Sequence, residues 1–422
     1  LKAPLMKKSE IKYRHNLIES FLYSFRILEE ITKLLSNIPD LERALARITA
    51  KTNNPRDLIL VKQFVSFTEQ IFLRLNNLKE KNLKELIPDK KILSKAYKTK
   101  KIIDDVIAET PPVNLNEGGV INDSVNTRLD ELRNLKQIKK EEIINLQEKY
   151  GVATNINNLK IKFNNFHGYF IEVTKKNISN IDSCKTIDFL LIQNTINSSR
   201  YQTSELRKIS QEIESSEDES LKLEQEIYED ICLKIIEITD DLSILTEKMA
   251  FIDVITSFAT LAELKNFVKP ELLNECRLNI TNGRHPVVEE GLIKKGDDFT
   301  PNNCEMNKKQ NIWLMTGPNM AGKRTFLRQV AIIIILNQIG SYVPADKASV
   351  GVFDKIFTRI GASDNLSEGM STFMMEMIET SRIVNEATEN SLVILDELGR
   401  GTSSEDGLAI AYSVLEFIAL KI

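Results

Sequence analysis

Residues 311–336 read NIWLMTGPNMAGKRTFLRQVAIIIIL, and this stretch decides the fold. Four apolar residues at 312–315 predict a strand, and after a glycine-containing turn the pattern becomes helical and strongly apolar. A strand, a glycine-rich turn and a helix are the context of a phosphate-binding loop, because backbone N–H groups and the positive end of the helix dipole can then face phosphate oxygens. We therefore predict an α/β P-loop domain with a nucleotide site.

The turn fits the pattern G-x-x-x-x-G-K-[ST] except at its last position. Lys323 is placed to reach the terminal phosphates, whereas Arg324 stands where a Ser or Thr hydroxyl normally holds Mg²⁺. Thr325 follows, but one step along a helix rotates a side chain by about 100°. A chance match in an ordinary loop is the alternative. The predicted nucleotide-binding residues of the turn are Gly317, Pro318, Asn319, Met320, Ala321, Gly322, Lys323, Arg324 and Thr325.

An acidic segment further along the chain, SLVILDELGRGTSSEDG at 391–407, argues against chance. Its four apolar residues at 392–395 predict a buried strand that delivers Asp396 and Glu397 at its carboxyl end. This is the arrangement of a Walker B motif, in which Asp396 would orient Mg²⁺ and Glu397 would polarise the attacking water as general base. A strand followed by a solvated acidic turn is the alternative. We therefore predict ATP and Mg²⁺ as cofactors, with Glu397 and Lys323 as catalytic residues.

Five strings occur in an order that resembles the MutS family of DNA mismatch-repair ATPases. They are TGPNMAGKRTFLRQ at 316–329, IGSYVPA at 339–345, FTRIGASDNL at 357–366, STFMMEM at 371–377 and LDELGRGTSSEDGLAIA at 395–411. The resemblance implies an ABC-like ATPase domain over 272–422 that acts as a homodimer on double-stranded DNA. It also implies a downstream repair ATPase of the MutL type as a partner and a cytoplasmic, nucleoid-associated location.

Two further site residues rest on the resemblance. Phe299 occupies the place where the family stacks an aromatic ring on adenine, and the alternative is that it packs in the core. Ser371 stands where ABC-type ATPases carry a signature motif, and there it would reach the nucleotide of the other subunit. A helix N-terminus aimed at a γ-phosphate gives this role a physical reason, while a plain N-cap serine is the alternative.

Length and composition describe a multidomain globular protein. The 422 residues suggest about three domains, and 42% of them are hydrophobic. The net charge is −4, so any DNA contact must come from local basic patches. Four widely spaced cysteines without a CxxC argue against a disulfide framework or a zinc site. No apolar run reaches the ~18 residues of a membrane span, and no signal peptide is visible.

The rest of the chain predicts long helices around a small β element. Residues 1–150 read as an all-α core with a first lever helix at 123–150, and 206–271 read as a second lever helix. Apolar residues in the second helix alternate at spacings of three and four, which is a coiled-coil-like seam that needs a partner, and 123–150 is available antiparallel. The seam is Tyr228, Ile231, Ile235, Ile238, Leu242, Leu245, Met249 and Ile252.

Residues 151–205 predict a β-rich clamp between the two lever helices. The string LKIKFNNFHGYFIEV at 159–173 alternates, turns and runs on, which predicts a β-hairpin. Four lysines against one glutamate give 159–176 a charge of +3, which suits the DNA backbone rather than base recognition. A solvated strand face is the alternative. The predicted DNA-binding residues are Lys160, Lys162, Lys175 and Lys176.

The chain begins with Leu1 and stops within an apolar helical pattern, so we expect truncation at both ends. By the resemblance, the mismatch-binding and connector domains and the C-terminal end of the ATPase domain would lie outside this sequence. The predicted function is that of a DNA mismatch repair protein of MutS type, an ATP-dependent clamp on mismatched DNA. A MutS2-like recombination-suppressing ATPase, an SMC-like coiled-coil ATPase and a catalytically impaired DNA clamp or scaffold fragment are the alternatives.

Overall fold

The computed structural model describes residues 3–78, 80–164, 166–318, 321–360, 372–396, 398–399 and 401–421. Within them the chain is mostly helical, with three separate sheets, and no helix is long and apolar enough to cross a membrane. Two compact units emerge from the contacts. The terminal unit comprises Leu1–Asn37, Ile71–Ile87 and Lys248–Ile422, and the middle unit comprises Ile38–Gln70 and Pro88–Glu247.

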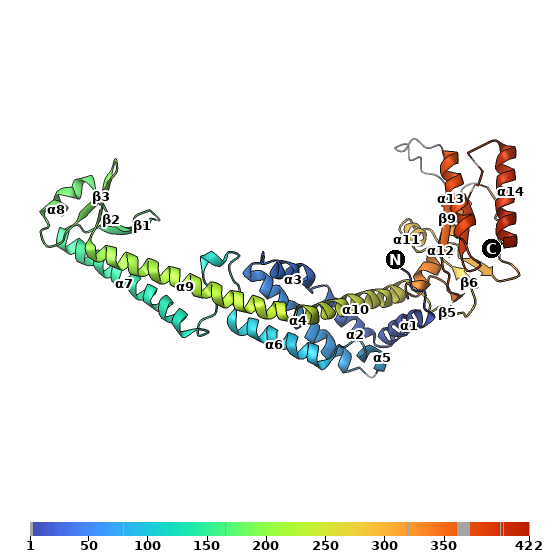
Figure 1. The fold of residues 1–422 in the computed structure, drawn as a ribbon, viewed down its shortest axis with the longest axis horizontal. Coiled ribbons are helices and arrows are strands. Elements are labelled where there is room, and N and C mark those ends of the chain that lie inside the picture. The colour runs from blue at the N-terminus through green and yellow to red at the C-terminus, as the bar shows by residue number, and fades with distance from the viewer. Residues whose placement is uncertain are drawn as a thin grey trace. The chain divides into compact units, whose positions relative to one another are not determined.

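The middle unit consists of helices that lead to a small sheet (Figure 1). Its helices are α3 (Leu41–Thr49), most of α4 (Pro55–Asn76), α6 (Lys90–Val106), η1 (Leu115–Glu117), α7 (Thr127–Thr154), η2 (Lys175–Asn177), α8 (Ile178–Ser183) and α9 (Ser204–Glu237). Its antiparallel sheet has the order β1-β2-β4-β3, formed by β1 (Lys160–Asn164), β2 (Gly168–Thr174), β3 (Leu190–Asn194) and β4 (Ser198–Gln202). The predicted hairpin is therefore confirmed as β1–β2, and β3 and β4 extend it.

Helices α7 and α9 lie side by side and carry the sheet at one end (Figure 1). Both begin at side-chain caps, because Asn126 accepts a hydrogen bond from the Leu129 N–H and Thr203 accepts one from the Leu206 N–H. One apolar core joins both helices to the sheet, and its buried members include Leu146, Tyr150, Ile171, Val173, Leu206 and Ile209. Burial of these side chains fixes the sheet on the helix pair.

The predicted pairing of 123–150 with the seam is wrong in its register. Ion pairs run from Lys149–Glu205 at one end of α7 to Arg128–Glu219 at the other, so α7 covers only the first part of α9. The seam begins beyond α7, and Tyr228 instead accepts a hydrogen bond from Asn53, which follows α3. The burial of the seam is confirmed for all its members except half-buried Ile238.

The second long helix is also shorter than the sequence suggests, because it breaks at Ile238. Ile238 has φ −111° and ψ 15°, which ends α9, and α10 (Thr239–Lys265) follows. Several β-branched residues lie just before Ile238 in the sequence, and such residues lower the helix propensity. Asp240 and Asp241 then lie in the first turn of α10, where their charges favour a new helix N-terminus.

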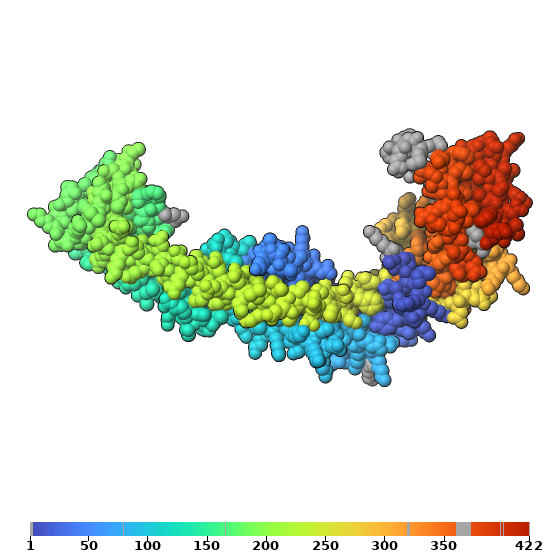
Figure 2. Space-filling model, viewed as in Figure 1, coloured from blue at the N-terminus to red at the C-terminus, as the bar shows by residue number. Residues whose placement is uncertain are grey.

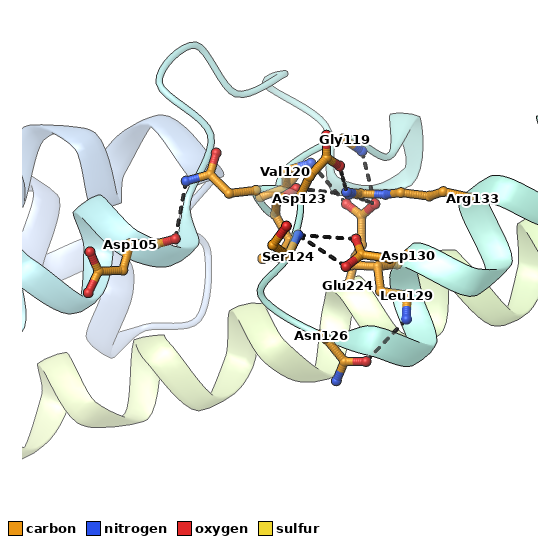
Figure 3. A network of polar contacts seen from close by, with 12 residues as sticks. Asp105, Gly119, Val120, Asp123, Ser124, Asn126, Leu129, Asp130, Arg133 and Glu224 are labelled. Carbon is orange, nitrogen blue, oxygen red and sulfur yellow. Dashed lines mark hydrogen bonds and ion pairs between the residues drawn. The ribbon is translucent and has the colours of Figure 1, made fainter.

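A buried carboxylate anchors the loop before α7 (Figure 3). Glu224 on α9 accepts hydrogen bonds from the backbone N–H groups of Gly119 and Val120, at 3.1 and 2.9 Å. Arg133 on α7 donates to the same carboxylate at 2.8 Å and also pairs with Asp123 at 2.6 Å. Glu224 is 2% exposed, so these partners replace the water that its charge loses on folding.

We expect Glu224→Ala to lower the stability of the middle unit by about 3 kcal/mol, because it leaves Arg133 and two N–H groups without their acceptor. Urea unfolding and hydrogen exchange at Gly119 and Val120 measure the loss. The matched control is Glu217→Ala, whose carboxylate pairs with Lys136 at the surface and should be worth less than about 1 kcal/mol. Equal losses in the two variants would contradict the role of the buried carboxylate.

The terminal unit combines helices with two sheets (Figure 1). Its helices are α1 (Lys8–Tyr23), α2 (Phe25–Leu35), α5 (Lys81–Lys84), most of α10, α11 (Pro286–Ile293), α12 (Lys323–Gln338), α13 (Thr372–Glu386) and α14 (Ser404–Lys421). The first sheet has the order β5-β8-β6-β7, with β5 (Glu271–Leu272), β6 (Leu278–Gly283), β7 (Asn302–Met306) and β8 (Lys347–Val350). The second sheet is the parallel pair β9 (Ile356–Ile360) and β10 (Leu392–Asp396).

Helix α12 is the centre of the apolar core of this unit. Its buried face carries Val330, Ile333 and Ile334, which pack with Ile280 of β6 and Ile394 of β10. The helix begins at Lys323, as the sequence predicts. The predicted strand at 312–315 does not form among the described residues: Leu314 is 82% exposed, and no ladder joins this segment to a neighbouring strand.

Helix α1 is tied to the turn after α12 by a buried histidine. His15 is 1% exposed, and its Nε2–H donates to the Ser341 carbonyl oxygen at 3.1 Å. Its ring also meets the edge of the Tyr342 ring, with centroids 6.1 Å apart. Burial lowers the pKa of His15 to about 4, and the charge of Lys269 adds to this effect. The neutral imidazole is therefore the form that the fold holds.

The stability of the terminal unit should decrease as the pH falls from about 6.5 to 4. Over this range the unfolded chain binds a proton on His15 that the folded chain excludes. The contribution is fully present above pH 6.5 and is on the order of 3 kcal/mol. His15→Gln can still donate to Ser341 but cannot titrate, so it should flatten the curve in this window. Thermal unfolding of the two proteins measures the difference, and parallel curves would contradict it.

Candidate functional site

The turn before α12 contains two glycines with positive φ. Gly317 and Gly322 have φ values of +148° and +86°, which are open to glycine and strained for other residues. The Lys323 ammonium folds back over the turn, where it donates to the carbonyl oxygens of Gly317 and Pro318. The helix N-terminus and this lysine thus lie at the same turn, which is the arrangement that attracts a phosphate. Asn319 and Met320 lie outside the described residues.

Asp396 lies at the carboxyl end of β10, as the sequence predicts. Leu392 and Ile394 bury the strand against α12, and β10 runs parallel to β9. The Asp396 carboxylate is 10% exposed, and its Oδ2 accepts a hydrogen bond from Nε of Arg324 at 2.5 Å. The Arg324 guanidinium therefore pairs with the Asp396 carboxylate, to which the sequence analysis assigns a metal ion. This contact joins residues 72 positions apart, and the sequence analysis does not predict it.

The turn after β10 is held by a glutamate that the sequence analysis misses. Glu376 on α13 is 1% exposed and accepts a hydrogen bond from the Gly399 N–H at 2.5 Å. Gly399 has φ +83°, and a Cβ there would lie 2.5 Å from the Gly407 carbonyl oxygen, so only glycine fits. The available signal was a single carboxylate within the methionine-rich string STFMMEM, on the side of the helix that faces the core.

The remaining predicted residues of this site are more scattered. Phe299 is half-buried in the loop before β7, outside the apolar core around α12. Ala321 is exposed, and Thr325 is half-buried with no hydrogen bond from its side chain to another described residue. Glu397 and Ser371 lie outside the described residues. No group of three or more His, Cys, Asp or Glu side chains that could hold a metal ion occurs in the part of the chain that the structure describes.

The outer face of the small sheet carries the predicted basic residues of β1. In the strand register Lys160 lies opposite Glu172, and Glu172 lies opposite Arg200 of β4. These three side chains therefore share one face of the sheet. Lys162 lies on this face as well and forms an ion pair with Glu172. The hydrogen bond from Lys162 holds the pKa of Glu172 below its usual value, and burial opposes that shift. The face therefore carries three cations and one anion.

Arg200 is a basic residue that the sequence analysis misses. Its guanidinium lies over the ring of Phe170, 4.6 Å from the centroid, and packs close to Glu172. The alternation of SSRYQ at 198–202 was the available signal. Lys175 and Lys176 follow β2 in η2, where both are exposed and neither pairs with an acidic group among the described residues. The structure thus brings the four predicted lysines to one end of the middle unit.

Two family models and several known proteins that match this chain carry the name MutS. The family model described as MutS domain III matches residues 1–259, and the one described as MutS domain V matches residues 313–422. The chain is 43% identical over 430 aligned residues to the DNA mismatch repair protein MutS of Rickettsia prowazekii (strain Madrid E). It is 42% identical to that of Rickettsia africae (strain ESF-5) and 43% identical to that of Rickettsia typhi (strain ATCC VR-144 / Wilmington). The alignments cover all of this chain and 47% of each relative.

Proposed function

Because this chain belongs to the MutS family, we propose that it supplies the nucleotide-binding and DNA-clamping parts of a DNA mismatch repair protein. The chain spans about half the length of the curated relatives it matches, so the activity of the whole protein belongs to this proposal. The Lys323 turn at the start of α12 is the observation that carries it. Its ammonium, its glycines and the helix N-terminus meet beside the carboxyl end of β10.

The proposed nucleotide site lies in an ABC-like ATPase domain over 272–422. The turn at 317–325 would hold the phosphates, and Phe299 would stack on adenine. Ser371 would reach the nucleotide of a second subunit, and Glu397 would act as general base if the nucleotide is hydrolysed. The half-exposed ring of Phe299 is compatible with stacking on a ligand.

We expect Lys323→Ala to weaken binding of a fluorescent ATP analogue by roughly 10- to 100-fold, because the variant has no ammonium to bind the terminal phosphates. Fluorescence anisotropy measures the dissociation constant. The control is Lys347→Ala, which removes an exposed lysine from β8 and changes the net charge by the same amount. If both variants bind as tightly as the unmodified chain, the turn is not a nucleotide site.

The proposed DNA-binding part is the sheet at 151–205, used as a clamp. The core and lever assignments at 1–150 and 206–271 belong to the same proposal, with α7 and the two-part helix α9–α10 as the levers. The support is electrostatic, because Lys160, Lys162, Lys175, Lys176 and Arg200 gather at one end of the middle unit, although the total charge of the chain is negative. Lysines on a strand attract phosphates without reading bases, so the clamp would bind any duplex.

We expect duplex binding to depend steeply on salt and to be equal for matched and mismatched DNA. Lys160→Ala, Lys175→Ala and Lys176→Ala should each flatten the slope of log K against log salt by about 0.9 for every phosphate that the variant no longer neutralises. Lys162→Ala should act less, because Glu172 already neutralises this lysine. Fluorescence anisotropy over a salt series measures the slopes. Lys234→Ala on α9 is the charge-matched control, and an equal effect there would exclude the sheet as the DNA-binding surface.

We further propose a homodimer, a partner ATPase of the MutL type and a cytoplasmic, nucleoid-associated location. Helix α14 supports an interface, because it lies at the surface of the terminal unit (red in Figure 2) and exposes apolar side chains. Leu408, Tyr412 and Leu420 are 71%, 68% and 73% exposed. A second candidate function, a DNA clamp or scaffold with impaired catalysis, is favoured by the ion pair of Arg324 with Asp396.

A further inference from the structure

The Arg324–Asp396 ion pair joins the two elements between which a P-loop ATPase holds its metal ion. Arg324 lies in the first turn of α12, directly after the phosphate-binding lysine, and Asp396 ends β10. Their Nε and Oδ2 atoms are 2.5 Å apart, so the pair is a charge-assisted hydrogen bond. The carboxylate is largely buried, while the arginine side chain is 51% exposed.

These residues do not fit Mg²⁺. The ion requires oxygen ligands in near-octahedral geometry, and in P-loop proteins a hydroxyl at the position of Arg324 and the carboxylate of the second strand supply or orient them. Arginine has five N–H donors and no lone pair, so it cannot be a ligand. It also keeps its positive charge at every pH that a protein meets, and a cation beside Asp396 would face that charge.

The arginine has one property of a metal ion, which is positive charge, and its N–H donors other than Nε–H would be the ones to reach a triphosphate while Nε stays on Asp396. Together with Lys323 and the N-terminus of α12 it places two adjacent cations and a helix dipole at one turn. A guanidinium matches phosphate oxygens in two-pronged geometry, whereas a metal ion demands that the nucleotide and water complete its shell. Metal-free nucleotide carries more negative charge than its magnesium complex, and an additional fixed cation favours the more negative ligand.

We infer that the Arg324 guanidinium stands in for the divalent cation, so that this site binds a nucleoside triphosphate without a metal ion. The inference rests on the proposed nucleotide site at 317–325. It concerns binding alone and assigns no hydrolytic step to the arginine. It also implies that exchanging Arg324 for a hydroxyl residue converts the site to one that needs Mg²⁺, because Asp396 is then released for the cation.

The test is a titration of the full chain with a fluorescent ATP analogue, in excess MgCl₂ and in excess EDTA. The unmodified chain should bind with dissociation constants within about threefold of each other in the two media. Arg324→Ser should bind at least about tenfold more weakly in EDTA than in MgCl₂, because serine cannot form the charge-assisted hydrogen bond to phosphate and Mg²⁺ must replace it. Arg324→Lys keeps the charge and should remain indifferent to EDTA.

A second variant isolates the carboxylate. Arg324→Ser combined with Asp396→Asn should lose the preference for MgCl₂ that Arg324→Ser alone acquires, and thermal unfolding of each variant checks that it folds. A tenfold or larger requirement for Mg²⁺ in the unmodified chain would overturn the inference and leave the nucleotide site in place. If Arg324→Ser binds in MgCl₂ and the unmodified chain binds in neither medium, the inference is also overturned and the nucleotide site again remains. Absence of binding in every protein and medium would overturn the proposed site itself.

Discussion

Burial of α12 is the interaction on which the terminal unit depends. A helix N-terminus attracts an anion only if the helix is held in place, and isolated helices of this length are marginal in water. Val330, Ile333 and Ile334 remove the helix from solvent between the first sheet and β10, and the turn at Lys323 is consequently fixed in front of Asp396. The position of the site residues therefore depends on the packing of apolar side chains that do not themselves belong to the site.

The middle unit solves a different problem, which is to hold a small sheet at the end of two helices. The apolar core around Tyr150 and Leu206 attaches the sheet, and exposed ion pairs accompany the antiparallel register of α7 and α9. At the other end of α7, Glu224 replaces lost water with two backbone N–H groups and Arg133. Apolar burial thus supplies the attachment, and buried hydrogen bonds supply the register.

The sequence predicts features that depend on near neighbours in the chain. The start of α12, the β1–β2 hairpin and the burial of the seam follow from local patterns, and all three are present. The features it misses need contacts over long distances, as with Arg324 and Asp396 or with Glu376 and Gly399. The segment at 312–315 fails for the same reason, because an apolar run becomes a strand only when a neighbour accepts its backbone hydrogen bonds. The break at Ile238 was the local exception, since its β-branched residues were legible but outweighed by the regular apolar spacing.

The ion pair between Arg324 and Asp396 also bears on how a nucleotide could act as a signal. A ligand shifts a conformational equilibrium only by the difference between its affinities for the two states. A salt bridge that already ties the start of α12 to the end of β10 favours the joined state over one in which those elements are separate, and so reduces that difference. Such a site can hold the ligand, but ligand binding then changes the conformation of the rest of the protein little. The allosteric coupling free energy, rather than the affinity, is the quantity that this single arginine would reduce most.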